Sequence, residues 1–227
     1  MNKEEFLSKI NLFEGLKPKE LEEISKFFHE RTYKKNEYIF FEGDDEPGIY
    51  ILVDGIVKLT KETADGKTVI LRLVTPGEVF GWLVVGESKP ESTYTAQALI
   101  DSTVLHIPNA DFLRLLVTYP AIAVRITCDA SKRVLEAYDR LKSLAAEKVE
   151  GRIASLLLEL AKKIGKEENG KIVINAPITR QDIAEMTGTT VETAIRIISK
   201  WKKEGILNTQ RGRIEILDVD YLESLVS

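Results

Sequence analysis

The chain has 227 residues, of which 44% are hydrophobic and 30% charged, with a formal net charge of −4. That length fits one large domain or two ordinary ones, with enough apolar residues to form a buried core. The single cysteine, Cys128, excludes an intrachain disulfide and an all-cysteine metal or iron–sulfur site, and it suits a reducing cytoplasm. The first residues lack the apolar run of a signal peptide, and no segment reaches the roughly 18 apolar residues of a membrane span. We therefore expect a cytoplasmic protein with no membrane contact.

The first half of the chain is predicted to contain helix followed by many short strands. Apolar residues in the segment 3–30 recur with helical spacing, ending at Leu21, Ile24, Phe27 and Phe28. Runs rich in β-branched and aromatic residues follow, separated by glycine turns, and they predict strands at 38–41, 48–53, 56–59, 68–74 and 102–107. Short strands at such regular spacing are typical of a double-sheet jelly roll, also called a double-stranded β-helix.

A long helix is predicted after Pro120, where the hydrophobic period changes. Small and apolar residues there alternate in steps of four and three over about six turns, with charged residues elsewhere. This narrow seam favours pairing with a second copy of the helix, which would make the protein a homodimer with two-fold symmetry. An ordinary amphipathic helix packed on its own domain is the alternative. The seam comprises Ala123, Thr127, Ala130, Val134, Ala137, Leu141 and Leu144.

The last third of the chain reads as a second domain from residue 147. An apolar-periodic helix is expected at 150–165, followed by a polar loop at 165–170. The segment 147–227 holds 13 basic and 13 acidic residues and is neutral. Within this segment, positive charge is in excess at 179–213, which contains seven basic and four acidic residues. Any nucleic-acid contact is therefore expected in that stretch.

Residues 178–198 predict a helix-turn-helix. Thr179 with Asp182 and Thr189 with Glu192 have the spacing of two capping boxes, which mark two helix starts. Gly188 lies between them, where a tight turn needs a residue that tolerates left-handed φ. The second helix is expected at about 190–202, and a hairpin with its tip at 211–213 would form a wing.

The second helix of this motif has two different faces. Ala194, Ile197, Ile198 and Trp201 should pack inward, whereas Glu192, Ile195, Arg196 and Ser199 should point outward. An outward arginine can bind guanine in two places, a glutamate can accept from cytosine, and isoleucine can touch a thymine methyl group. We predict that Glu192, Ile195 and Arg196 read bases. The phosphate contacts expected around them are Arg180, Gln181, Thr190, Thr193, Lys200 and Arg211. In the alternative interpretation, Glu192 only caps the helix and pairs with Arg196.

The order of jelly roll, long helix and winged helix-turn-helix resembles the CRP/FNR family of bacterial transcription regulators. The segments 178–184 and 191–196 look like that family's DNA-reading signature, and Val191 is closer to the FNR branch. The resemblance implies an α+β protein with a sensor domain at 1–118, a dimerisation helix at 119–146 and a DNA-binding domain at 147–227. It also implies a palindromic operator with TGA-type half-sites read by Glu192 and Arg196. Such a dimer would recruit RNA polymerase as an activator or block it.

The predicted sensor departs from the family's cyclic-nucleotide receptors. Trp82 stands where those receptors carry a glutamate for the ribose, and Ser92 stands where they carry an arginine for the phosphate. Ala137-Tyr138 replaces their adenine-contacting Thr-Ser pair. A buried cyclic phosphate without its arginine would lose a charge-assisted partner, so we expect an effector other than cyclic AMP. The expected pocket, at the junction of roll and helix, comprises Gly81, Trp82, Leu83, Ser92, Thr93, Tyr94, Ala137 and Tyr138, together with Val84 and Val85.

Other interpretations of the sensor stay open. The cysteine cluster of an FNR-type iron–sulfur sensor is absent, whereas haem would need His29, His106 or Cys128 as its axial ligand. The aromatic residues could equally form a ligand-free core in a regulator that needs no effector. A cupin-type enzyme would need clustered histidines around a metal, and the chain has two histidines without ligand spacing. A module with a protein partner and a vestigial helix-turn-helix is the last alternative.

Overall fold

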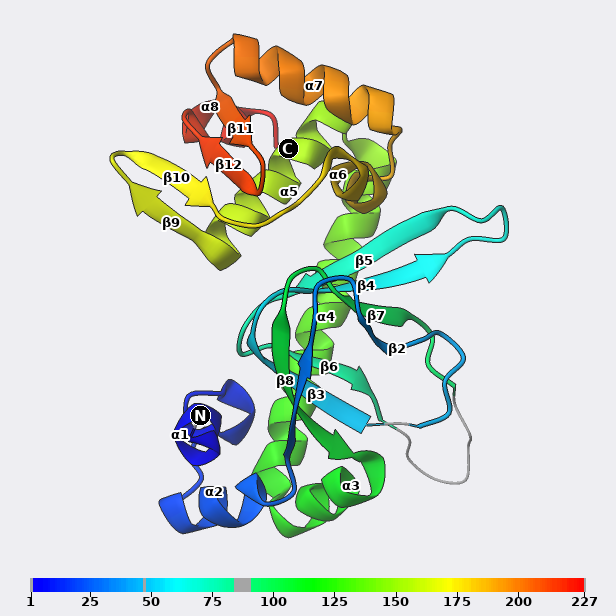
Figure 1. Ribbon diagram of the computed structural model, residues 1–227, viewed down its shortest axis with the longest axis vertical. Helices are drawn as coiled ribbons and strands as arrows, with labels where there is room; N and C mark the ends of the chain where they lie inside the picture. Colours follow the sequence, from blue (N-terminus) through cyan, green and yellow to red (C-terminus); the bar gives the residue numbers. More distant parts are fainter. Residues whose placement is uncertain (1, 47, 84–90, 227) are drawn as a thin grey trace. The chain divides into compact units, whose positions relative to one another are not determined.

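The computed structural model describes residues 2–46, 48–83 and 91–226, and contacts between Cα atoms divide the chain into two units. The first contains Met1–Lys61 and Leu71–Leu135, and the second contains Glu62–Ile70 and Glu136–Ser227. The division falls inside the long helix α4 (Pro120–Ala146) (Figure 1).

The N-terminal segment is less regular than expected. Instead of one helical stretch to residue 30, three short helices form, because Gly15 turns the chain with φ of 89° and Pro18 starts a new helix. Leu21, Ile24 and Phe28 are buried as the spacing predicts, but the strand β1 already begins at His29. The helices are α1 (Lys3–Ser8), the 3₁₀ helix η1 (Asn11–Phe13) and α2 (Pro18–Ser25).

Two four-stranded antiparallel sheets form the jelly roll, which confirms the predicted fold. One sheet has the order β1-β8-β3-β6, made of β1 (His29–Tyr33), β8 (Ser102–Pro108), β3 (Gly48–Asp54) and β6 (Val79–Trp82). The other has the order β2-β7-β4-β5, made of β2 (Tyr38–Phe40), β7 (Thr95–Ala98), β4 (Val57–Glu62) and β5 (Thr68–Val74). The five predicted strands are present, and β1, β6 and β7 are additional.

Two hydrophobic clusters stabilise the first unit. One joins the N-terminal helices to the roll, to α3 (Asn109–Thr118) and to the start of α4. The other fills the interior between the sheets and contains the aromatic group Phe40, Tyr50 and Phe80, with Trp82 and Tyr94 packed against it. Its rings lie 4.9–6.3 Å apart between centroids, the range in which aromatic pairs attract one another.

The second unit contains the predicted winged helix-turn-helix. Helix α5 (Val149–Ile164) packs Ile153, Leu157 and Leu160 inward, with Trp201 fully buried in the same unit. The expected polar loop at 165–170 is wrong: a hairpin forms there, because Asn169 and Gly170 both adopt the positive φ of a tight turn. The remaining elements are β9 (Gly165–Glu168), β10 (Lys171–Ile174), α6 (Arg180–Thr187), α7 (Val191–Lys203), β11 (Leu207–Gln210), β12 (Arg213–Ile216) and α8 (Val219–Ser224).

Candidate functional site

The first helix of the motif, α6, begins with the predicted capping box. The Thr179 amide donates to Asp182 Oδ2 at 2.8 Å, and the Asp182 amide donates back to Thr179 Oγ1 at 3.1 Å. The helix ends at Gly188, whose φ of 63° and ψ of 43° are left-handed as predicted. Both ends of α6 are therefore defined by the sequence signals expected for them.

Arg152 supports the turn of the motif, and the sequence analysis missed it. Its Nε donates to the Thr187 carbonyl at 2.8 Å, and Nη2 donates to the Gly188 carbonyl at 3.4 Å. Its Nη1 also donates to the Glu147 carbonyl, ahead of α5. The guanidinium thus satisfies carbonyl groups that a helix end leaves without partners. Because these partners lie 35 and 36 residues away, no local pattern identifies the role.

The second helix, α7, presents the predicted reading face. Glu192, Ile195 and Arg196 are exposed, and 47% of the Ile195 surface is open to solvent. Ser199 is exposed too, whereas the four inward-facing residues of α7 are buried as predicted. The helix is capped by Thr190, which accepts from the Thr193 amide at 3.2 Å, so the expected capping box between Thr189 and Glu192 is wrong.

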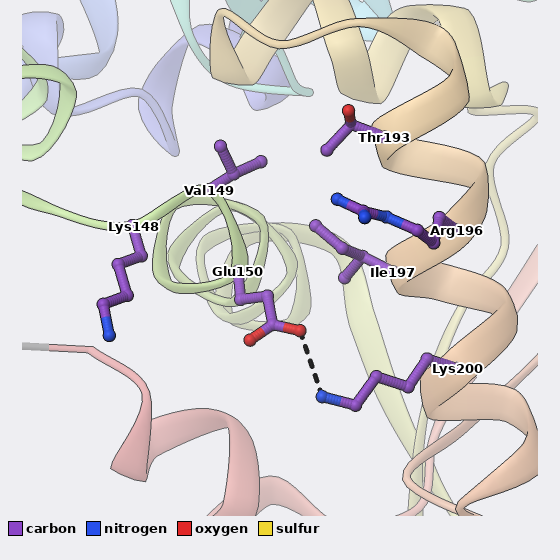
Figure 2. A pocket seen from close by; sticks show the side chains of 7 residues that line it. All are labelled: Lys148, Val149, Glu150, Thr193, Arg196, Ile197 and Lys200. Carbon is purple, nitrogen blue, oxygen red and sulfur yellow. Dashed lines mark hydrogen bonds and ion pairs between the residues drawn. The ribbon is translucent and has the colours of Figure 1, made fainter.

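Among the described residues no ion pair joins Glu192 to Arg196, so neither capping nor pairing accounts for these two side chains. Figure 2 shows Arg196 and Thr193 at a pocket between α7 and the start of α5. Lys148, Val149 and Glu150 form its other wall. An exposed arginine with no carboxylate partner is free to bind an acceptor from another molecule.

Several of the side chains predicted to contact phosphate already have hydrogen-bond partners within the protein. Lys200 pairs with Glu150 at 3.1 Å, and this hydrogen bond raises the pKa of Lys200 (Figure 2). Arg180 donates to Thr209 Oγ1 on β11 at 2.8 Å, and burial lowers the pKa of its guanidinium. Gln181 donates to Glu185 at 2.6 Å. Arg211, at the exposed tip between β11 and β12, remains open to a phosphate.

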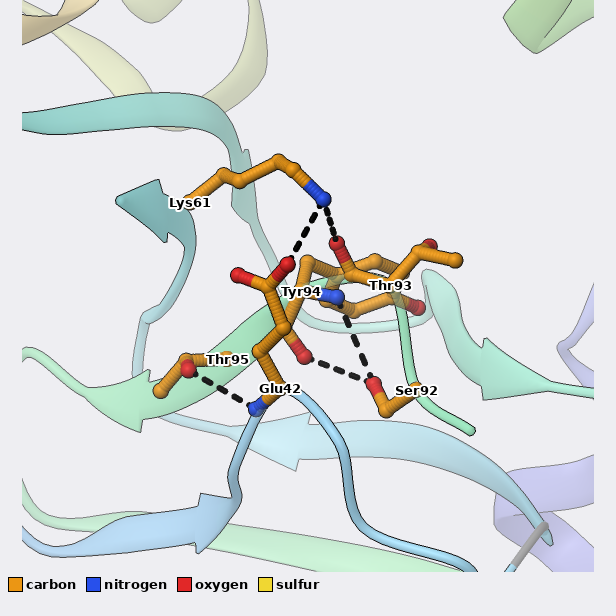
Figure 3. Close-up of polar contacts among 6 residues, drawn as sticks. All are labelled: Glu42, Lys61, Ser92, Thr93, Tyr94 and Thr95. Atoms are coloured by element: carbon orange, nitrogen blue, oxygen red, sulfur yellow. Dashed lines mark hydrogen bonds and ion pairs between the residues drawn. The ribbon is translucent and has the colours of Figure 1, made fainter. Parts of the chain in front are cut away.

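The predicted effector residues of the roll are engaged mainly with one another. The Tyr94 hydroxyl donates to the Gly81 carbonyl at 2.7 Å and accepts from the Gly81 amide at 3.0 Å. Ser92 is buried, and its hydroxyl donates to the Tyr94 carbonyl at 2.6 Å. Figure 3 shows Thr93 beside this pair, with its carbonyl accepting from Lys61 at 3.0 Å.

Two other predicted pocket residues of the roll pack against different hydrophobic clusters. Leu83 packs against the cluster of the N-terminal helices, whereas Trp82 packs on Phe40 in the interior cluster, as Tyr94 does. Ala137 and Tyr138 are exposed and belong to the second unit. Val84 and Val85 lie outside the described residues.

Of the three haem-ligand candidates, one contacts the aromatic group of Phe40, Tyr50 and Phe80 and the other two are exposed. His106 on β8 is buried, stacks on Tyr50 with ring centroids 4.5 Å apart, and has a pKa lowered to about 4 by burial. His29 begins strand β1, although the helical spacing was expected to continue to residue 30, and Cys128 is exposed on α4. None of the described helices combines the length and the apolar character needed to cross a membrane.

A winged helix-turn-helix carried with a β-roll defines a DNA-binding transcription regulator, and comparison with known proteins agrees. Residues 30–119 match the model of the cyclic nucleotide-binding domain, and residues 151–225 match that of the Crp-like helix-turn-helix domain. The chain belongs to the CRP/FNR family of transcription regulators. Its similar proteins are transcription regulators rather than enzymes.

Individual relatives match over nearly the whole chain. The transcriptional regulator SdrP of Thermus thermophilus is 30% identical over 199 residues, covering 86% of this chain and 92% of that protein. The cyclic AMP receptor protein of the same organism is 28% identical over 94% of this chain and 95% of its own length. The solved structure of FixK2 from Bradyrhizobium japonicum superimposes with a TM-score of 0.78 at 26% identity, covering 88% and 98% of the two chains.

Proposed function

We propose that this regulator acts as a homodimer that reads a palindromic operator with TGA-type half-sites, through Glu192, Ile195 and Arg196. The observation that carries the proposal is the exposed Ile195 between two charged side chains on a capped, well-packed helix. Among the described residues no ion pair joins Glu192 to Arg196 and Ile195 is not buried, whereas a major groove offers a partner for each of the three groups. A dimer bound this way would recruit or block RNA polymerase.

The exposed seam of α4 supports self-association. Val134, Leu141 and Leu144 are 49%, 61% and 45% exposed in the single chain. Leu135 and Tyr138 are exposed beside them, so the apolar surface is broader than the predicted seam. A stripe of this kind is stable in water when another helix covers it, and a second copy presents the same stripe. The segments 1–118, 119–146 and 147–227 would then sense, dimerise and read DNA respectively.

The proposed effector is a small molecule other than cyclic AMP. One relative is named as a cyclic AMP receptor protein, but here Trp82 and Ser92 replace the two polar residues that would hold ribose and phosphate. The Ser92 hydroxyl and both backbone groups of Gly81 already have partners within the roll. Binding a cyclic nucleotide there would break these hydrogen bonds without an arginine at position 92 to compensate.

The reading face is tested by Arg196→Ala and its matched control Lys202→Ala. Lys202 is exposed on the same helix but outside the predicted base-reading group. Arg196→Ala should reduce discrimination at the guanine by about 1–3 kcal/mol per half-site, roughly 5- to 150-fold. Lys202→Ala should weaken all duplexes equally and lower the salt slope by about two, because the dimer loses one phosphate contact in each half-site.

Fluorescence anisotropy with the palindrome and with duplexes mutated at each half-site position, over a range of salt, separates the two effects. Retention of the full sequence preference by Arg196→Ala would show that another group reads the base, and the proposed reading face would be abandoned.

A further inference from the structure

Two arginines from distant parts of the chain meet at one carbonyl group in the first unit. Arg72 on β5 donates from Nη2 to the Val79 carbonyl at 2.9 Å, and Arg133 on α4 donates from Nη2 to the same oxygen at 2.5 Å. A carbonyl oxygen has two lone pairs, so these two bonds use its full capacity. The remaining donors of both guanidinium groups must find other acceptors.

Part of this donor capacity is unused. The Nε atoms of Arg72 and Arg133 are shielded from solvent, and neither has a hydrogen-bond partner within the described residues. Native proteins leave few buried donors in this state, and a role in binding is one reason where they do. Two such donors on neighbouring guanidinium groups mark a place that suits an acceptor with several oxygens.

Two cations and two carboxylates lie near this carbonyl group, and both carboxylates already have partners. Arg133 pairs with Asp129 at 2.5 Å, whereas the Glu78 carboxylate accepts from the Thr75 amide and hydroxyl. Burial, followed by the positive charge of Arg133, lowers the pKa of Arg72, although Glu78 and Asp129 oppose the shift. Arg72 is therefore a half-buried cation beside another cation, without a carboxylate in an ion pair among the described residues. A bound anion would relieve both the repulsion and the unfilled donors.

We propose that Arg72 and Arg133 bind a small carboxylate or phosphate anion, which is the charged end of the effector. The inference rests on the proposed function, since it names the ligand class of its sensor. Tyr94 lies within electrostatic reach of both guanidinium groups. The rings of Tyr94 and Trp82 pack on Phe40. The uncharged part of the ligand would therefore contact an aromatic surface. The guanidinium fork fits the paired oxygens that carboxylates and phosphates share.

The test titrates the full-length protein with inorganic phosphate and with succinate, each against potassium chloride at equal ionic strength. Thermal melts and calorimetry compare the wild type with Arg72→Gln, Arg72→Lys and Arg133→Gln. Arg125→Gln is the control, because Arg125 also lies on α4 but pairs with Glu14 at the surface. We expect one of the two anions to raise Tm in the wild type and in Arg125→Gln. Its binding should weaken at least tenfold in Arg72→Gln and Arg133→Gln, and less in Arg72→Lys.

A second readout separates a binding site from a structural pair. Arg72→Gln also removes the hydrogen bond to the Val79 carbonyl, so the readout is the rise in Tm on adding the anion rather than the Tm in anion-free buffer. That rise should be lost in Arg72→Gln and Arg133→Gln and kept in Arg125→Gln, and equal rises in all variants would overturn the inference. DNA binding is measured on the same samples: wild type that reads the palindrome but binds neither anion refutes the anion site alone. Anion binding without preference for the palindrome refutes the proposed function alone.

Discussion

Acid should lower the folding stability of this protein by protonating His106, and the lowered pKa of this side chain sets the size of the loss. His106 lies on β8 with 8% of its surface exposed, opposite Tyr50 on β3 and His29 on β1. Burial, followed by the charges of Arg31 and His29, lowers its pKa from 6.5 to about 4. The unfolded chain therefore binds a proton before the folded one as pH falls. The stabilisation from neutral His106 is fully present above about pH 6.5 and is lost on the way down to about pH 4.

The full difference between 6.5 and about 4 corresponds to about 3.4 kcal/mol at 1.36 kcal/mol per pKa unit. Relaxation of the fold and entry of water around the charged ring reduce this penalty, so we expect about 1–2 kcal/mol, which is about 2–8 °C in Tm for a protein of this size. Urea unfolding and thermal melts at pH 7.5 and 4.5 measure the loss of stability in the wild type and in His106→Phe. The larger loss in the wild type is the contribution of His106. Phenylalanine keeps the stacking on Tyr50 without the titrating nitrogen.

Carboxylates that titrate between pH 7.5 and 4.5 lower the stability of both proteins equally. Subtracting the change in unfolding free energy of His106→Phe from that of the wild type therefore removes their contribution. His29→Gln serves as the control, because His29 is exposed on the neighbouring strand. An equal loss of stability in wild type and His106→Phe between the two pH values would refute the reasoning.

Two further predictions concern the roll and the long helix. Tyr94→Phe removes the hydroxyl that both donates to and accepts from Gly81, so the free energy of unfolding should fall by about 1–3 kcal/mol in a urea titration. Unchanged stability would mean that water replaces the hydroxyl. Leu141→Glu places a charge on a side chain that is 61% exposed in the single chain. It should convert the proposed dimer into folded monomers, as measured by analytical ultracentrifugation, with an unchanged circular dichroism spectrum. A dimer that persists in the variant would exclude this seam as the interface.

The DNA-reading part of the chain was predictable because its signals are local. The positions of Thr179, Asp182 and Gly188 define one helix and its end, and the 3.6-residue period sorts α7 into a buried and an exposed face. The partners of Arg180 and Lys200 were not predictable, since Thr209 and Glu150 lie 29 and 50 residues away. Whether a basic side chain is free for phosphate therefore depends on tertiary contacts that no spacing contains.

The strands that the sequence analysis missed have physical reasons in common. β1 is an edge strand whose first four residues are exposed, so it lacks the alternation of a half-buried strand. β7 consists of small and polar residues, which carry little strand preference although it pairs on both sides. β9 is polar throughout, but Asn169-Gly170 is a strong signal for a two-residue hairpin turn and could have identified it.

In the roll, the proposed binding site and the core differ in whether their polar groups already have partners. Ser92 and Tyr94 occupy positions where the sequence suggested a pocket, yet their hydroxyl groups bind the backbone of the roll itself. A ligand placed there would have to break bonds that already exist, and the cost is that of leaving buried groups unpaired. The Nε atoms of Arg72 and Arg133 are in the opposite condition, because an acceptor placed beside them would break nothing. For the proposed effector site, unfilled donors are therefore a better guide to the ligand's position than aromatic residues.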